Sequence, residues 1–269
     1  MEQNIKMVIS YDGSRYLGWQ RLGGEQRKQS IQGTLEMALE ELFAQSVSII
    51  GSGRTDAGVH AMGQVANFLI EERVLFQALE RNASKKKPKD MVCLLRELKQ
   101  LLNERLSEDI RILSMVPVKK TFHSRYSAVE KTYEYHIDTR EVPNVFTRKN
   151  ALWEPENLEL EKMEEAAKIL IGKHDFKAFS TQGKVEKDTI RTLKQIQFTK
   201  ENNHLKCSFT GDGFLYNMVR ILMGTLLEIG RGEREMETIV RAFATGDRQL
   251  AGATVSSVGL FLKEVRYKE

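Results

Sequence analysis

The chain has 269 residues, 41% of them hydrophobic and 29% charged, which is an ordinary composition for a soluble globular protein. Its net charge of +4 permits an RNA partner without requiring one, because the distribution of the 41 Lys and Arg residues matters more than their sum. Two distant cysteines form neither a disulfide framework nor a metal motif, no apolar run approaches the ~20 residues of a membrane span, and no secretory signal is apparent. We therefore expect a cytoplasmic protein without a membrane segment.

The N-terminal residues predict a strand followed by an aromatic and basic loop. Apolar residues alternate with polar ones over 5–11, which indicates a strand that ends at Asp12-Gly13. The loop over 14–21 interleaves two arginines with two aromatic residues, Arg15, Tyr16, Trp19 and Arg21. Such a loop could stack on bases and pair with phosphates, or it could be packed by its own side chains.

A helix is expected next. Ser30 is a suitable N-cap residue, and apolar residues then recur at helical spacing from Ile31 to Leu42. This helix leads to a short alternating run, Val47 and Ile49, that we interpret as a strand.

The stretch 51–68 reads G-S-G-R-T-D-A-G-V-H-A-M-G-Q-V-A-N-F and is interpreted as a loop between two strands. Four glycines permit tight turns and close approach of the backbone to a ligand. Between them lie the reactive groups of Arg54, Asp56 and His60. A small polar loop held by two apolar strands can present a reactive side chain, although a hairpin whose Asp56 bonds its own backbone would have the same pattern.

Residues 80–90 form a lysine-rich segment with lysines at 85, 86, 87 and 89 around Pro88. Such a run is expected to be a solvated loop, with contact to an RNA backbone as the alternative. Leucines at helical spacing over 94–102 then predict a helix.

The stretch 121–138 begins T-F-H-S-R-Y-S-A and continues as K-T-Y-E-Y-H-I. Tyr133, Tyr135 and Ile137 alternate with polar residues, which predicts a strand. From spacing alone, a tyrosine on such a strand could belong to the core or form a platform for a ligand.

The second half of the chain repeats the expected order of elements in the first half. A linker with two prolines precedes an amphipathic helix over 160–171, and alternating strands follow over 192–198 and 205–209. The order strand, helix, strand, strand, helix in each half suggests two ferredoxin-like units.

The stretch 214–230 is apolar almost all round and predicts a buried helix. Asn217, Arg220 and Gly224 form its single polar stripe. A buried guanidinium requires a partner, since an unpaired buried charge costs several kcal/mol, very roughly. That partner could be a structural acid such as Glu228 or an acid of a functional site.

Several of these strings together resemble the tRNA pseudouridine synthase A family. The strings are Y-D-G-S-R-Y-L-G-W-Q near the N-terminus, R-T-D-A-G-V-H-A followed by G-Q-V-A-N-F, F-H-S-R-Y-S-A with the tyrosine pair, and M-V-R at 218–220. The resemblance spans nearly the whole chain. It departs at the insertion near 80–90 and at Ser107, where the family has a proline.

The resemblance implies an α+β fold of two ferredoxin-like subdomains that share an extended, mostly antiparallel sheet with a central active-site cleft. We place the subdomains at residues 1–118, which carry the catalytic loop, and 119–269. The resemblance also implies a homodimer that holds tRNA, and a reaction without cofactor or metal.

The resemblance implies a role for individual residues. Asp56 is expected to be the catalytic nucleophile, with Arg220 holding its carboxylate and Tyr133 packing against the target base. The residues expected to contact the substrate are Arg54, Tyr133, Arg125, His60 and Gln64, with Arg54 filling the gap that the flipped uridine leaves in its stack.

The expected activity is conversion of uridine to pseudouridine in tRNA, in the anticodon stem-loop just 3′ of the anticodon. A related synthase acting on another RNA, such as ribosomal RNA, is the nearest alternative. A base-removing N-glycosidase and a non-catalytic RNA-binding protein are the alternatives from other classes, and Asp56 in an intact motif argues against the last.

Overall fold

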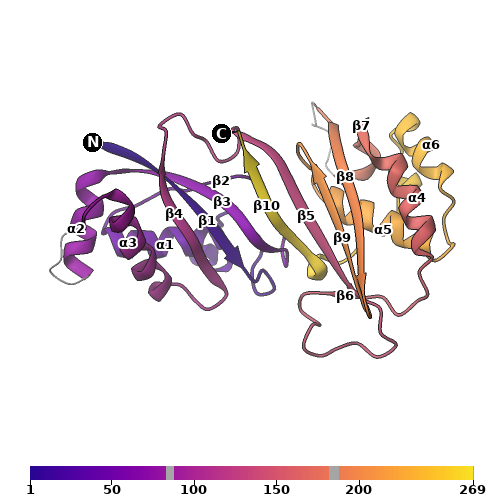
Figure 1. Ribbon diagram of the computed structural model, residues 1–269, viewed down its shortest axis with the longest axis horizontal. Helices are drawn as coiled ribbons and strands as arrows, with labels where there is room; N and C mark the ends of the chain where they lie inside the picture. The colour runs from indigo at the N-terminus through magenta and orange to yellow at the C-terminus, as the bar shows by residue number, and fades with distance from the viewer. Residues whose placement is uncertain (83–87, 182–187, 269) are drawn as a thin grey trace. The chain divides into compact units, whose positions relative to one another are not determined.

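The computed structural model describes residues 1–82, 88–181 and 188–268 (Figure 1). The chain divides into two compact units: Met1–Ala128 together with Tyr267 at the end of the last strand, and Val129–Arg266. This division comes ten positions after the sequence-based boundary at residue 118. Residues 83–87 of the lysine-rich segment, which include three of its four lysines, lie outside the described residues.

The first unit has the element order of a ferredoxin-like fold. Its elements are β1 (Glu2–Tyr11), the 3₁₀-helix η1 (Gly24–Gln29), α1 (Ile31–Phe43), β2 (Ile50–Gly51), β3 (His60–Glu71), α2 (Glu72–Asn82), α3 (Met91–Arg105) and β4 (Ile110–Val118). The strands lie in the order β4-β1-β3 with β2 on β3, and all these pairings are antiparallel. This arrangement is that of a β-α-β-β-α-β unit with an extra helix.

The core of the first unit lies between the strands and the helices α1, α2 and α3, which are gathered beside them in Figure 1. Ile5, Met7 and Ile9 of β1 are fully buried, as the alternation predicts. The Ser30 Oγ accepts a hydrogen bond from the backbone nitrogen of Gly33, so the predicted N-cap of α1 is confirmed. The leucine face of α3 is also confirmed, whereas α2 was not predicted.

The second unit repeats this topology. Its elements are β5 (Ala128–Asp138), β6 (Leu152–Trp153), α4 (Leu160–Leu170), β7 (Gly172–Asp175), η2 (Lys177–Phe179), β8 (Ile190–Glu201), β9 (His204–Gly211), α5 (Met218–Gly230), α6 (Glu237–Thr245), η3 (Arg248–Leu250), η4 (Ser257–Gly259) and β10 (Leu260–Tyr267). The strand order is β10-β5-β9-β8-β7. The order β10-β5-β9-β8 in this unit corresponds to the order β4-β1-β3-β2 in the first unit.

The expected fold class is thereby confirmed as α+β with mostly antiparallel strands. One strand that departs from this pattern is β6, which pairs in parallel with β5. The central cleft stays a prediction, because it concerns the arrangement of the two units. None of the helices in the described ranges has the length and apolar character needed to span a bilayer.

Two boundaries differ from the sequence-based ones. The expected loop over 51–68 is shorter, because β2 lies at Ile50–Gly51 and β3 already begins at His60. The helix expected over 214–230 begins only at Met218, since Asn217 has a left-handed φ of 59° that interrupts helical geometry before it.

Candidate active site

Asp56 lies in the loop 52–59, which joins β2 to β3 of the first unit. Its side chain is half-buried, and its carbonyl oxygen accepts a hydrogen bond from the backbone nitrogen of Val59 at 3.1 Å. Two residues earlier, Arg54 is exposed. The loop therefore turns tightly just after Asp56 and holds Arg54 toward solvent.

Two contacts from the first unit fix the residue before Asp56. The Tyr11 hydroxyl lies 2.8 Å from Thr55 Oγ1, and the Trp19 backbone nitrogen donates to the Thr55 carbonyl at 2.9 Å. Burial raises the pKa of Tyr11 to about 12, so its phenol keeps its proton at neutral pH. These contacts hold the backbone immediately before the proposed nucleophile.

Close backbone approach makes this clamp possible. Gly18 has a φ of +104°, and a Cβ atom there would lie 2.7 Å from the Thr55 carbonyl oxygen and 3.1 Å from the carbonyl carbon of Asp56. Any side chain at position 18 would thus push against the backbone that carries Asp56. The loop after β1 is consequently packed by its own side chains, with Trp19 2% exposed, rather than presenting Trp19 to a ligand.

Gln64, which was expected to contact the substrate, is fully buried on β3. Its Oε1 accepts from Ser52 Oγ at 2.6 Å, and its Nε2 donates to the Gly53 carbonyl at 3.2 Å. Both ends of this amide therefore hold the first turn of the Asp56 loop.

His60, another buried member of the expected substrate set, begins β3. Its Nδ1 lies 3.2 Å from the backbone nitrogen of Gly13, which donates to it, and 3.2 Å from Asp12 Oδ1. A Cβ atom at Gly13 would lie 1.9 Å from the Val59 carbonyl oxygen. His60 thus ties the Asp12-Gly13 turn to the end of the Asp56 loop.

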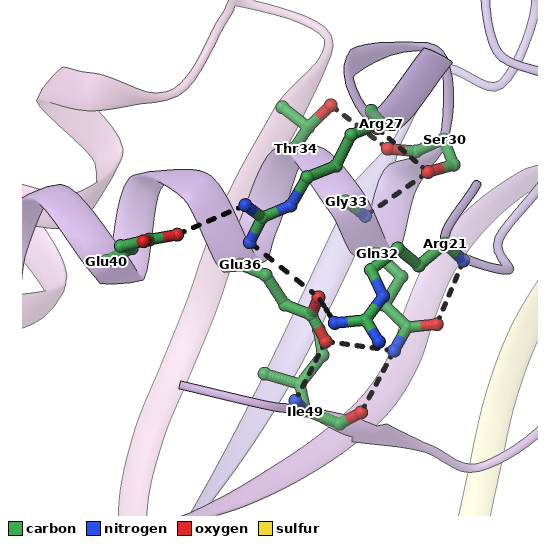
Figure 2. Close-up of polar contacts among 9 residues, drawn as sticks. All are labelled: Arg21, Arg27, Ser30, Gln32, Gly33, Thr34, Glu36, Glu40 and Ile49. Atoms are coloured by element: carbon green, nitrogen blue, oxygen red, sulfur yellow. Dashed lines mark hydrogen bonds and ion pairs between the residues drawn. The ribbon is translucent and has the colours of Figure 1, made fainter. Parts of the chain in front are cut away.

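A buried carboxylate on α1 secures the entry to β2 (Figure 2). Glu36 is fully buried, and one of its oxygens accepts from Gln32 Nε2 at 3.0 Å and from the Ile49 backbone nitrogen at 3.2 Å. Its other oxygen accepts from Arg21 Nη1 at 3.0 Å, and Arg27 Nη2 lies 4.0 Å away. Ile49 immediately precedes β2, so this network anchors the chain that leads to Asp56.

In the second unit, Tyr133 lies on β5 with the buried residues Tyr135 and Ile137 on the same face. Tyr133 is 9% exposed, and its ring makes a T-shaped contact with that of Phe214 at a centroid distance of 5.0 Å. The predicted strand is confirmed. The expected contact with a base stays a prediction for this largely packed ring.

Arg220 lies in the first turn of α5 rather than in the middle of that helix, and it is half-buried. Its Nε donates to the Val255 carbonyl at 2.7 Å, and its Nη1 donates to Asn217 Oδ1 at 2.8 Å. Glu228 is engaged elsewhere, with Arg234 Nε at 2.7 Å. The guanidinium is therefore oriented by two neutral oxygen acceptors of its own unit.

Arg125 lies in the loop between β4 and β5 and is exposed. Across the described ranges, no three His, Cys, Asp or Glu side chains are grouped so that they could hold a metal ion.

Comparison with known proteins decides the family. The profile described as tRNA pseudouridine synthase matches residues 7–127 and 166–268. The chain is 39% identical over 264 residues to tRNA pseudouridine synthase A of Bacillus sp. (strain KSM-64), with 98% of this chain and 99% of that protein covered. It is 40% identical over 265 residues to the protein of that name from Clostridium kluyveri, with coverage of 98% and 100%. The chain belongs to the tRNA pseudouridine synthase family.

Several residues that build the site in this member of the family were not singled out from the sequence. Tyr11 contacts the side chain of Thr55, and Gly18 lies against the backbone of the Asp56 loop. Glu36 accepts from the backbone of Ile49, just before β2. Gly18 lies within the N-terminal string that resembles the family, and that position could have identified it as a site residue. Glu36 offered only a weak signal, a carboxylate on the apolar face of a predicted helix.

Proposed function

We propose that this chain isomerises uridine to pseudouridine in tRNA, at positions in the anticodon stem-loop just 3′ of the anticodon. The observation that carries the proposal is Asp56 on a tightly clamped loop in a chain of the tRNA pseudouridine synthase family. The substrate type follows from the names of the relatives, and the position within tRNA follows from the sequence resemblance.

The reaction breaks the C1′–N1 bond of uridine, rotates the base, and joins its C5 atom to C1′, after which C5 loses a proton and N1 gains one. The product has the same atoms and the same oxidation state as the substrate. An ionised Asp56 serves either by attacking C1′ or by assisting a glycal-type route. In both routes the carboxylate must be ionised when the reaction begins, which favours a cationic neighbour.

We assign the remaining roles as follows. Arg220 stabilises the ionised Asp56, and its bonds to Val255 and Asn217 give its guanidinium a fixed direction for that task. Tyr133 packs against the flipped base, and the exposed Arg54 occupies the space that the base leaves in its stack. Arg125 contacts a phosphate. His60 and Gln64 act mainly through the loop that they hold.

The assembly and location are further parts of the proposal. The working form is a homodimer with one tRNA held across both subunits, and the protein acts in the cytoplasm. A mass in solution near twice the 30.8 kDa of the chain would agree with the dimer. A mass near 30.8 kDa at working concentration would exclude it and leave the chemistry intact.

The substrate is tested by mapping pseudouridine at single-nucleotide resolution across tRNA and ribosomal RNA, in cells with and without the gene. The proposal predicts loss of pseudouridine only from anticodon stem-loop positions. Loss from ribosomal RNA instead would assign the chain to a related synthase with a different substrate, and free uracil as the product would indicate an N-glycosidase.

A further inference from the structure

The loop between β4 and β5 is closed on itself by short-range hydrogen bonds. The His123 backbone nitrogen donates to Ser127 Oγ at 3.1 Å, and the Ser127 nitrogen donates to the His123 carbonyl at 2.9 Å. The His123 Nδ1 also accepts from the backbone nitrogens of Arg125 and Tyr126, each at 3.2 Å. Residues 123–127 therefore form a compact turn.

A buried polar network holds this turn against the strands of the first unit. Asn67 Oδ1 on β3 accepts from the Ser124 nitrogen at 2.9 Å and from Ser124 Oγ at 2.7 Å. Asn67 Nδ2 donates to Asn4 Oδ1 at 2.9 Å, and Asn4 Nδ2 donates to the Phe122 carbonyl at 2.9 Å. Asn4, Asn67 and Ser124 are 1%, 3% and 0% exposed. Buried amides that are hydrogen-bonded at both their oxygen and their nitrogen fix the turn in one position.

The fixed turn presents a large aromatic ring to solvent. Tyr126 is 78% exposed, although its ring lies 4.4 Å from that of His123 between centroids. The Arg125 guanidinium carbon lies 5.8 Å from the centroid of the Tyr126 ring. Proteins that bind single-stranded nucleic acid stack its bases on aromatic side chains, and arginines add cation–π contacts there, so an exposed, pre-positioned ring with a guanidinium over it suits that use.

We propose that His123, Arg125 and Tyr126 form a stacking platform for an unpaired base of the bound RNA, with Tyr126 under the base and Arg125 on a neighbouring phosphate. The proposal extends the function proposed above and rests on it.

The charge of the segment favours RNA over an apolar protein surface as the ligand. Residues 119–128 read K-K-T-F-H-S-R-Y-S-A and contain three cations and no acid. Lys119, Lys120 and Arg125 are all exposed. Because Tyr126 is already held on a fixed turn, stacking on it requires little further ordering of the protein.

The test uses the Asp56→Asn protein, so that binding is measured without turnover, and a labelled anticodon stem-loop RNA. Tyr126→Ala should weaken RNA binding about tenfold, the effect typical of losing one stacked base. Tyr126→Phe should bind as tightly as the parent, while Tyr126→Leu, which is apolar but has no ring, should resemble Tyr126→Ala. Phe76→Ala, at a part-exposed aromatic residue on α2 of the same unit, is the control and should leave RNA binding unchanged.

A spectroscopic measurement separates stacking from general contact. A tryptophan introduced by Tyr126→Trp should be quenched when the RNA binds, whereas one introduced by Phe76→Trp should not. Because Tyr126 is mostly exposed, the changes at this position should leave the thermal unfolding of the protein unaltered.

The outcomes separate this inference from the proposed function. If the wild-type protein isomerises tRNA while Tyr126→Ala binds RNA as tightly as its parent, the platform is wrong and the function stands. If binding depends on Tyr126 but the wild-type protein forms no pseudouridine in any tRNA, the proposed function is wrong and the platform stands. Equal affinities for Tyr126→Leu and Tyr126→Phe would also overturn the stacking proposal.

Discussion

At the scale of single residues, we expect Arg220 and Arg125 to act on different charges. Arg220 is half-buried and directed by Val255 and Asn217, whereas Arg125 is exposed on a basic turn. The first suits a carboxylate of the site and the second suits a phosphate.

Arg220→Met keeps much of the aliphatic stem and removes the charge. Losing a cation near a carboxylate raises the pKa of that carboxylate, so the acid limb of the pH–rate profile should move to higher pH. The salt dependence of RNA binding should stay nearly unchanged, because no phosphate contact is lost.

Arg125→Met is the matched variant and should show the reverse pattern. The slope of log affinity against log salt should become shallower by about 1, with the pH profile intact. If Arg220→Met makes the salt slope shallower and leaves the acid limb in place, the two assignments are exchanged.

At the scale of elements, the turn after β1 and the loop before β3 work as one clamped backbone. Gly18→Ala would force a side chain into a left-handed φ of +104° and within 2.7 Å of the Thr55 carbonyl oxygen. We expect kcat to fall by at least about tenfold, since small displacements of a catalytic group are costly. Gly23→Ala in the same segment is the control, because a Cβ atom there meets nothing within 4 Å. Equal turnover in the two variants would contradict the clamp.

The second element-scale prediction concerns Glu36 on α1. Breaking a fully buried pair can cost several kcal/mol, but the side chains of Arg21 and Arg27 are 49% and 30% exposed and can regain water. We therefore expect Glu36→Gln to lower the free energy of unfolding by about 1–3 kcal/mol in urea titrations.

Glu40→Gln is the matched control for this change. Glu40 lies on the same helix, pairs with Arg27 at 3.1 Å, and has a side chain that is 46% exposed. Its loss should cost less than about 1 kcal/mol. A Glu36→Gln protein as stable as Glu40→Gln would mean that the network does not anchor β2.

At the scale of the whole molecule, the spacing of apolar residues predicted two similar units, because that spacing is regular along most of the strands and helices. The alternation at Tyr133, Tyr135 and Ile137 and the Ser30 cap each depend on neighbours in the sequence, and the structure confirms both. The chain follows the same strand order twice although its halves share no obvious repeat.

What the sequence did not predict depends either on the backbone conformation of a single residue or on contacts between distant segments. The start of α5 was hidden because Phe214 and Leu215 continue the apolar run, and only the left-handed backbone of Asn217 marks the boundary. The burial of Trp19 depends on how β1, the turn after it and β3 pack together. The hydrogen bonds at both ends of the Gln64 amide depend on the same packing. Local patterns contain no such information.

The central claim is that Asp56 carries the chemistry, and the direct measurement is pseudouridine formation in unmodified tRNA by purified protein. Asp56→Asn keeps the size of the side chain and removes its charge, so RNA binding and thermal unfolding should be preserved. Turnover should fall by at least about a thousandfold, as expected when a nucleophile is lost. A folded Asp56→Asn protein that forms pseudouridine at the wild-type rate would contradict the account.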